Sequence, residues 1–183
     1  MTSQSNTEDS PTPNGASTAT AHSSSAHQNE RTFFGHPFGL ANLSGVEMWE
    51  RFSFYGLQAL LAYYLYYTVA DGGLGMEQST ALSIVGAYGG LVYLTGVAGA
   101  WVADRILSAE RTLFYSAVLV MLGHISLALL PGYVGVTLGL VFIAVGSGAL
   151  KTTSQVVLGS LYSHDDPRRD GGFSIYYLSL IHI

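Results

Sequence analysis

Cysteine is absent from the 183-residue chain, which excludes disulfide bonds, thiolate nucleophiles and cysteine-ligated metal sites. Charged residues are also scarce, at 10% of the sequence against about 25% in a typical soluble domain. The 7 basic residues are outnumbered by 12 acidic ones, so nucleic acid is excluded as the main partner, because phosphate binding needs a basic face. Hydrophobic residues make up 49% of the chain. This composition is typical of a membrane protein.

The first 30 residues differ from the rest of the chain. They contain no Val, Ile, Leu or aromatic residue, and twelve of them are Ser or Thr. Such a segment cannot bury enough apolar surface to offset an ordering entropy of about 1 to 2 kcal/mol per residue. We predict a disordered tail over residues 1–36. No basic region followed by an apolar stretch opens the chain, so targeting is expected from the first membrane helix rather than from a cleaved signal peptide.

Three long segments of the remaining sequence carry no charged side chain. They are residues 52–70, 78–103 and 112–150. Because about 20 apolar residues span a bilayer, the third segment is long enough for two helices, and Pro131 and Gly132 divide it. The predicted transmembrane helices are residues 42–67, 80–102, 112–130 and 134–161, with a fifth beginning near residue 172. The predicted fold class is therefore an all-α membrane protein with four transmembrane helices and the start of a fifth.

The third predicted helix lacks a polar face. A soluble helical bundle is the alternative, but its helices need a polar face, and residues 117–130 offer only His124 and Ser126. Small residues recur in clusters, at residues 86–90, 96–99 and 146–148. In lipid, such residues let helix backbones approach closely. We therefore expect these helices to pack against other parts of the protein.

The loops between the predicted helices differ in charge. The loops after the second and fourth helices contain the basic residues Arg105, Arg111, Arg168 and Arg169. Residues 71–79 and 131–133 contain none. Because Lys and Arg near helix ends are retained on the cytoplasmic side, we predict a multi-pass protein of the cytoplasmic membrane with a cytoplasmic N-terminus.

Four charged side chains lie inside the predicted helices, where a charge costs at least about 2.5 to 3.5 kcal/mol at the helix centre. Glu47, Glu50 and Arg51 share one side of the first helix through their i, i+3 and i+4 spacing. We predict that Lys151, deep in the fourth helix, pairs with one of the two glutamates in an internal cavity. The alternative is that Arg51 and Lys151 extend toward the lipid headgroups. His124, alone on an apolar helix, is interpreted as a hydrogen-bonded core residue rather than a proton relay.

Four segments of the chain carry a family resemblance. Residues 47–56 (EMWERFSFYG) resemble the E-x-x-E-R-F-x-Y-Y-G signature of the proton-dependent oligopeptide transporters, a branch of the major facilitator superfamily. Residues 99–111 (GAWVADRILSAER) resemble the superfamily's G-x-x-x-D-R-x-G-x-R loop motif. Residues 146–154 (GSGALKTTS) resemble the fourth-helix motif G-x-G-x-x-K-P-N-x-S, and residues 168–177 (RRDGGFSIYY) are similar to the start of the fifth helix. The resemblance covers nearly everything after about Phe34.

The resemblance implies a proton-coupled symporter of di- and tripeptides, which is a carrier driven by the proton gradient, without a cofactor, and not an enzyme. It implies that Glu47 and Glu50 are proton-linked carboxylates and that Arg51 is the arginine that pairs with them. Lys151 matches the lysine that pairs across to these residues and contacts the carboxylate of the peptide. The implied partners are small peptides, protons, the lipid bilayer and the remainder of the transporter.

The resemblance also implies a set of substrate-binding residues. Tyr55 and Tyr93 match tyrosines that line the binding cavity, beside Lys151. Gln58 stands where many members have a second arginine, and Phe54 stands where many have the first tyrosine of the signature. The glutamine removes a possible cation for the peptide carboxylate, although some members carry glutamine there. Peptide therefore remains the predicted substrate.

Two interpretations fit Asp104 and Arg105, which match the loop motif. They form either a latch between helices on the inward-closed side or simply part of a loop retained by the positive-inside rule. Members of the family have about twelve helices in two halves of six, with the substrate held between the halves. The chain therefore resembles an N-terminal fragment, expected to be inactive alone. Residues 178–183 (LSLIHI) depart from the family's L-G-I-N-L-G, so we predict that this end is not native.

Other functions stay open at this point. The same scaffold could carry another small anionic solute. A membrane-embedded enzyme would need a nucleophile–base pair or a metal-ligand set, and His36, His124 and His164 do not lie near a carboxylate at ligand spacing within a helix. A non-transporting membrane adaptor would need neither a cavity nor Lys151.

Overall fold

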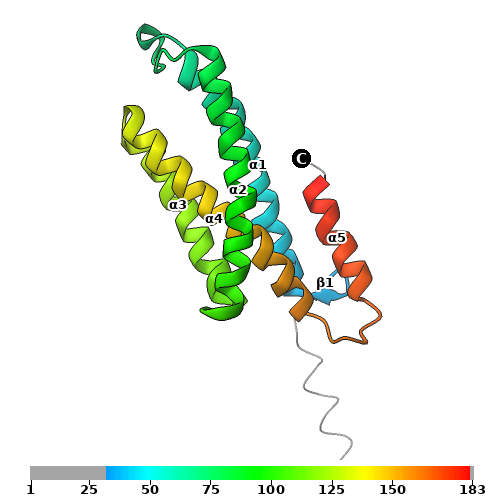
Figure 1. Ribbon diagram of the computed structural model, residues 1–183. Coiled ribbons are helices and arrows are strands. Elements are labelled where there is room, and N and C mark those ends of the chain that lie inside the picture. Colours follow the sequence, from blue (N-terminus) through cyan, green and yellow to red (C-terminus); the bar gives the residue numbers. More distant parts are fainter. Residues whose placement is uncertain (1–31, 182–183) are drawn as a thin grey trace, which may run out of the picture.

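The computed structural model describes residues 32–181, so most of the predicted disordered tail lies outside the described residues. Five α-helices dominate this part of the chain, which confirms the predicted all-α fold (Figure 1). They are α1 (Phe38–Tyr66), α2 (Gln78–Arg105), α3 (Ala109–Leu129), α4 (Gly132–Ser160) and α5 (Arg169–Ile181). The short elements are the strands β1 (Thr32–Phe33) and β2 (His36–Pro37) and the 3-10 turn η1 (Val69–Asp71).

Three of these helices, α2, α3 and α4, are long and apolar enough to cross a membrane. Helix α1 is as long as α4, at 29 residues, but its charged residues and its many tyrosines make it less apolar. Every helix begins two to four residues before its predicted start. The physical reason is that an apolar run marks only the part of a helix that crosses lipid, while backbone hydrogen bonding continues into the interface.

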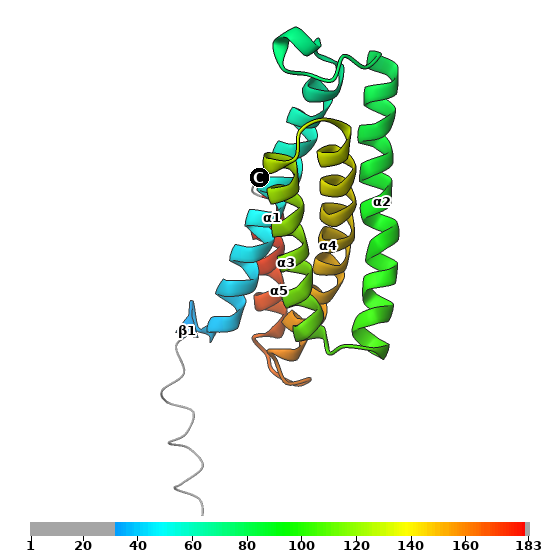
Figure 2. The same ribbon diagram turned by 90° about the vertical axis from the view of Figure 1, so that its left-hand side faces the viewer.

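Helix α4 lies at the centre of the bundle. It packs along α3 and α2, while α1 contacts α2, α4 and α5 (Figures 1 and 2). The predicted close approach through small residues is present at Gly148 of α4, which contacts the backbone of α2 at Val92 and Gly96. Beside it, the Thr95 hydroxyl of α2 donates a hydrogen bond to the Ala144 carbonyl of α4 at 2.7 Å. Small side chains thus let two helices join through backbone and hydroxyl contacts.

The loops lie at two opposite ends of the bundle. Those that follow α2 and α4 lie at the same end as the β1–β2 hairpin, and those that follow α1 and α3 lie at the other end (Figures 1 and 2). The four arginines named above therefore all occur at the hairpin end, because they lie in or beside the loops after α2 and α4. The basic residues of the loops are thus concentrated at one end of the molecule.

Residues 32–36, which we assigned to the disordered tail, are instead part of an ordered hairpin, so that boundary was wrong. Strands β1 and β2 pair antiparallel, and the hairpin rests on the α4–α5 loop. The Gly35 carbonyl accepts a hydrogen bond from Arg168 at 3.0 Å. The ring of His36 is hydrogen-bonded through Nδ1 to the Tyr162 hydroxyl, also at 3.0 Å. These partners are more than 120 residues away, so no local pattern could have indicated the hairpin.

The α4–α5 loop is itself held by an ion pair between Arg168 and Asp166. The guanidinium Nη2 and Nε donate to the two carboxylate oxygens at 2.9 and 3.1 Å. These hydrogen bonds lower the pKa of Asp166 below its ordinary value. The ion pair is therefore complete at neutral pH and is lost only as the pH falls through that lowered pKa.

Candidate functional site

An ion pair joins α1 to α4 in the middle of the bundle. The Lys151 ammonium lies 3.6 Å from Oε1 of Glu50. The predicted pairing of Lys151 with a glutamate of the first helix is therefore present, and the partner is Glu50. The Lys151 side chain is only 17% exposed, which argues against its extension toward lipid headgroups.

The two carboxylate oxygens of Glu50 have different surroundings. Oε1 accepts a hydrogen bond from the Ser147 hydroxyl in addition to its contact with Lys151. Oε2 is buried and has no hydrogen-bond partner among the described residues. A buried carboxylate oxygen without a partner is costly, so it can be stabilised by a proton or by an incoming donor. The site thus holds an acceptor without a donor among the described residues.

The second glutamate, Glu47, connects α1 with α4 and α5. It is 2% exposed, and its Oε1 lies 3.7 Å from Nε of Arg51. Its Oε2 accepts a hydrogen bond from the Ser154 hydroxyl at 3.1 Å, and Ser154 also hydrogen-bonds the Tyr176 hydroxyl of α5 at 2.8 Å. Movement of α5 relative to α1 would therefore disturb the environment of Glu47.

Three members of this network are not among the residues predicted from the sequence. Ser147 and Ser154 lie four residues before and three residues after Lys151, which places all three on one face of α4. This spacing is a signal that could have found both serines. Tyr176 had no such signal, because its contact depends on how α5 packs against the bundle.

Of the residues predicted to bind substrate, Lys151 belongs to this network, and the other three lie around it. Tyr55 of α1 is exposed and Tyr93 of α2 is 74% exposed. Gln58 is partly buried on α1, next to Gly89 of α2. The assignment of these three residues as substrate contacts stays a prediction. Their side chains are nevertheless accessible to a molecule outside the described bundle.

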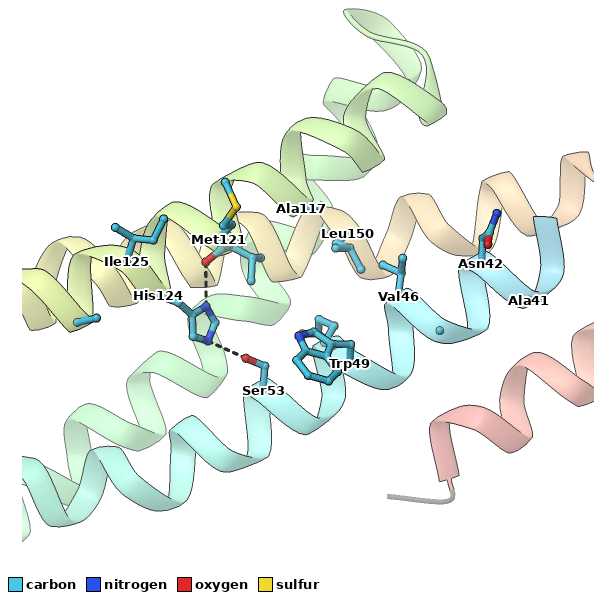
Figure 3. A pocket seen from close by; sticks show the side chains of 14 residues that line it. Ala41, Asn42, Val46, Trp49, Ser53, Ala117, Met121, His124, Ile125 and Leu150 are labelled. Atoms are coloured by element: carbon cyan, nitrogen blue, oxygen red, sulfur yellow. Dashed lines mark hydrogen bonds between the residues drawn. The ribbon is translucent and has the colours of Figure 1, made fainter. Parts of the chain in front are cut away.

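A cavity of about 1000 Å³ lies between α1 and α3, with Trp49, Ser53 and Leu150 in its wall (Figure 3). His124 of α3 points across it toward α1. Its Nδ1 donates to the Val120 carbonyl at 2.9 Å, so Nε2 is the acceptor for the Ser53 hydroxyl at 2.7 Å. Both ring nitrogens are satisfied, in agreement with the interpretation of His124 as a hydrogen-bonded residue.

The predicted latch residues, Asp104 and Arg105, end α2 and are exposed. Neither forms an ion pair with another residue in the range 32–181. A latch would therefore need a partner outside this range. The same range contains no group of three His, Asp or Glu side chains that could hold a metal ion.

Comparison with known protein families gives a match to the POT family model over residues 110–181. The Di-/tripeptide transporter of Lactococcus lactis subsp. lactis is 48% identical over 156 residues, which cover 84% of this chain and 31% of that protein. The chain therefore spans about a third of the length of the curated relatives it matches.

Solved structures of POT transporters are also similar to this chain. The crystal structure of peptide transporter POT in complex with sulfate superimposes with a TM-score of 0.80 and 44% identity, over 87% of this chain and 32% of that one. A POT family transporter in complex with 5-aminolevulinic acid superimposes with a TM-score of 0.78 and 43% identity, over 82% and 31% of the respective chains.

Proposed function

Because the chain belongs to the POT family, we propose that it forms the N-terminal part of a transporter that carries di- and tripeptides together with protons across the cytoplasmic membrane. The similarity to a transporter named for di- and tripeptides supports the substrate class. The buried Glu50–Lys151 ion pair is the observation that carries the proton coupling. The full-length protein that contains this chain is called the complete transporter below.

Peptide and proton transport are coupled because two carboxylates, that of Glu50 and that of the peptide, compete for the Lys151 ammonium. A peptide carries a carboxylate at its C-terminus, and that carboxylate is an alternative partner for Lys151. When the peptide takes Lys151, Glu50 loses its cation and is neutralised by a proton, because an unpaired buried charge is costly. Substrate and proton therefore enter the site together. A membrane potential drives the inward movement of one charge by about 2.3 kcal/mol per 100 mV.

The remaining predicted residues complete this proposal. Glu47 and Arg51 form the second ion pair of the network and relay its state to α5 through Ser154. Tyr55, Gln58 and Tyr93 contact the peptide, with Gln58 as a neutral hydrogen-bonding side chain. Asp104 and Arg105 latch the inward side to a segment outside residues 32–181.

A second substrate class has one specific observation in its favour. A POT family transporter 43% identical to this chain was solved with 5-aminolevulinic acid, which is a small amino acid rather than a peptide. The proposal is tested by uptake of labelled dipeptide into proteoliposomes that contain the complete transporter, with and without an inward proton gradient. We expect accumulation only with the gradient, and competition by unlabelled dipeptides. Uptake that dipeptides fail to inhibit, but that 5-aminolevulinic acid inhibits, would replace peptide with the small solute.

We further propose that the hairpin end of the bundle faces the cytoplasm, because the arginines of the loops gather there. This chain contains no cysteine. Single cysteines introduced into it, after removal of any cysteines elsewhere in the complete transporter, therefore give a clear labelling test. Ser108 and Glu77 are both exposed and lie at opposite ends of α2. We expect Glu77→Cys to react with an impermeant maleimide in intact cells and Ser108→Cys to react only after lysis. The reverse pattern would invert the orientation.

A further inference from the structure

An aromatic pair lies directly against the ion pair. The Lys151 ammonium is 4.4 Å from the centre of the Phe54 ring. Tyr88 of α2 also packs on Phe54, with its ring stacked at a centroid distance of 5.7 Å and an interplanar angle of 28°. Three helices thus meet at the Phe54 ring of α1, which contacts the ammonium of α4 and the Tyr88 ring of α2.

The ring is a close contact of an ammonium that is otherwise loosely held. The distance of 3.6 Å to Glu50 exceeds that of an ordinary charged hydrogen bond, and Ser147 already occupies the same carboxylate oxygen. An ammonium over an aromatic face is attracted by the ring quadrupole, and this attraction grows when water is excluded. This attraction does not require a hydrogen bond, so it does not compete with a carboxylate for the N–H donors of Lys151. Lys151 can therefore keep its contact with the ring while it exchanges one carboxylate for another.

Tyr88 acts here through its ring. It is buried, and its hydroxyl has no hydrogen-bond partner among the described residues. A buried tyrosine that leaves its hydroxyl unpaired loses a hydrogen bond, which needs compensation from its packing. The stack on Phe54 is such packing. Phe54 itself has no hydroxyl, so it offers Lys151 only an aromatic face.

From this geometry we propose that Phe54, supported by Tyr88, is a positioning residue that holds the Lys151 ammonium between Glu50 and the substrate carboxylate. This inference rests on the proposed peptide transport and extends it to a residue outside the ion-pair network. Phe54 acts through Lys151 and does not itself need to touch the substrate. Its effect is consequently confined to substrates that use Lys151.

The test compares a dipeptide with the same dipeptide amidated at its C-terminus. Both are measured as inhibitors of labelled-dipeptide uptake by the complete transporter, because the amide lacks the carboxylate that Lys151 would bind. In Phe54→Leu we expect the inhibition constant of the free-acid dipeptide to rise by roughly tenfold, the size of a desolvated cation–π contact. The inhibition constant of the amide is expected to stay unchanged. Phe54→Tyr keeps the aromatic face and is expected to retain the discrimination of the unmodified protein.

The chain offers a matched control in Phe52→Leu, the same chemical change at a ring that is 63% exposed and lies near Trp49. We expect no change in discrimination there. Equal weakening of the dipeptide and of its amide in Phe54→Leu, or loss of discrimination in Phe54→Tyr, would overturn the positioning role. If Phe54→Leu does not fold, Phe54→Met, with a similar volume and no ring, gives the same comparison. Absence of dipeptide uptake by the unmodified protein would instead reject the proposed function.

Discussion

Lys151→Ala is expected to reduce proton-driven peptide uptake by the complete transporter by about a hundredfold or more. Removing one partner of a buried ion pair typically costs about 3 to 5 kcal/mol, because the other charge stays buried without compensation. Among residues 32–181, Glu50 would then keep only its hydrogen bond from Ser147. It avoids the cost by holding a proton permanently, and a carboxylate that never releases its proton cannot couple transport to the gradient. Uptake of labelled dipeptide along a proton gradient, at matched expression, measures this effect.

Exchange of peptide already present on both sides of the membrane separates coupling from general damage. It requires no net proton movement, so we expect it to survive in Glu50→Gln, which mimics the protonated form, while driven uptake is lost. Glu77→Gln is the matched control, since Glu77 is exposed and lies outside the network. Wild-type levels of driven uptake in Lys151→Ala would remove Lys151 from the coupling mechanism and would favour an anchoring role at the interface.

Gly148→Val is expected to have the second large effect, this time on folding. A side chain at Gly148 would run into the Val92 carbonyl, the Gly96 amide and the Thr95 hydroxyl of α2. Two of these groups are backbone, so α2 and α4 must separate to make room. Overpacking of this kind costs about 1 to 3 kcal/mol or more. We expect a clearly lower melting temperature of the purified complete transporter in detergent, together with a smaller folded fraction.

Gly159 provides the control for this substitution within the same helix. It lies near the end of α4, and an added Cβ there meets nothing within 4 Å. Gly159→Val is therefore expected to leave the melting temperature close to that of the unmodified protein. Equal destabilisation by the two substitutions would mean that valine is disfavoured along the whole helix and that the α2–α4 contact is not special.

The charged residues of the candidate site could be predicted from the sequence. The cost of charge in lipid required a partner for Lys151, and the helical spacing of Glu47 and Glu50 placed both on the right side of α1. The choice of Glu50 could not be predicted, because both glutamates share that side and only the crossing of α1 and α4 selects between them. The same crossing brings Phe54 under the Lys151 ammonium.

The helices that cross the lipid bilayer could be predicted from the sequence. Apolar runs and the break at Pro131 gave the four long helices, since both signals are local. The hairpin at residues 32–37 was missed, because contacts with Arg168 and Tyr162 far along the chain accompany its order. The connection between α1 and α2 likewise contains the turn η1 (Val69–Asp71), which a backbone hydrogen bond and the Thr68 side chain stabilise. The charge pattern of the sequence contains no signal for this turn.

The coupling of peptide to proton movement through Glu50 and Lys151 is tested most directly by the proton flux itself. Proteoliposomes that contain the complete transporter and a trapped pH indicator are given an unlabelled dipeptide outside, with no imposed pH gradient and an inside-negative potential. We predict that the dipeptide acidifies the interior in the unmodified protein and leaves the interior pH unchanged in Glu50→Gln. Dipeptide entry without acidification in the unmodified protein, or unchanged acidification in Glu50→Gln, would contradict the mechanism.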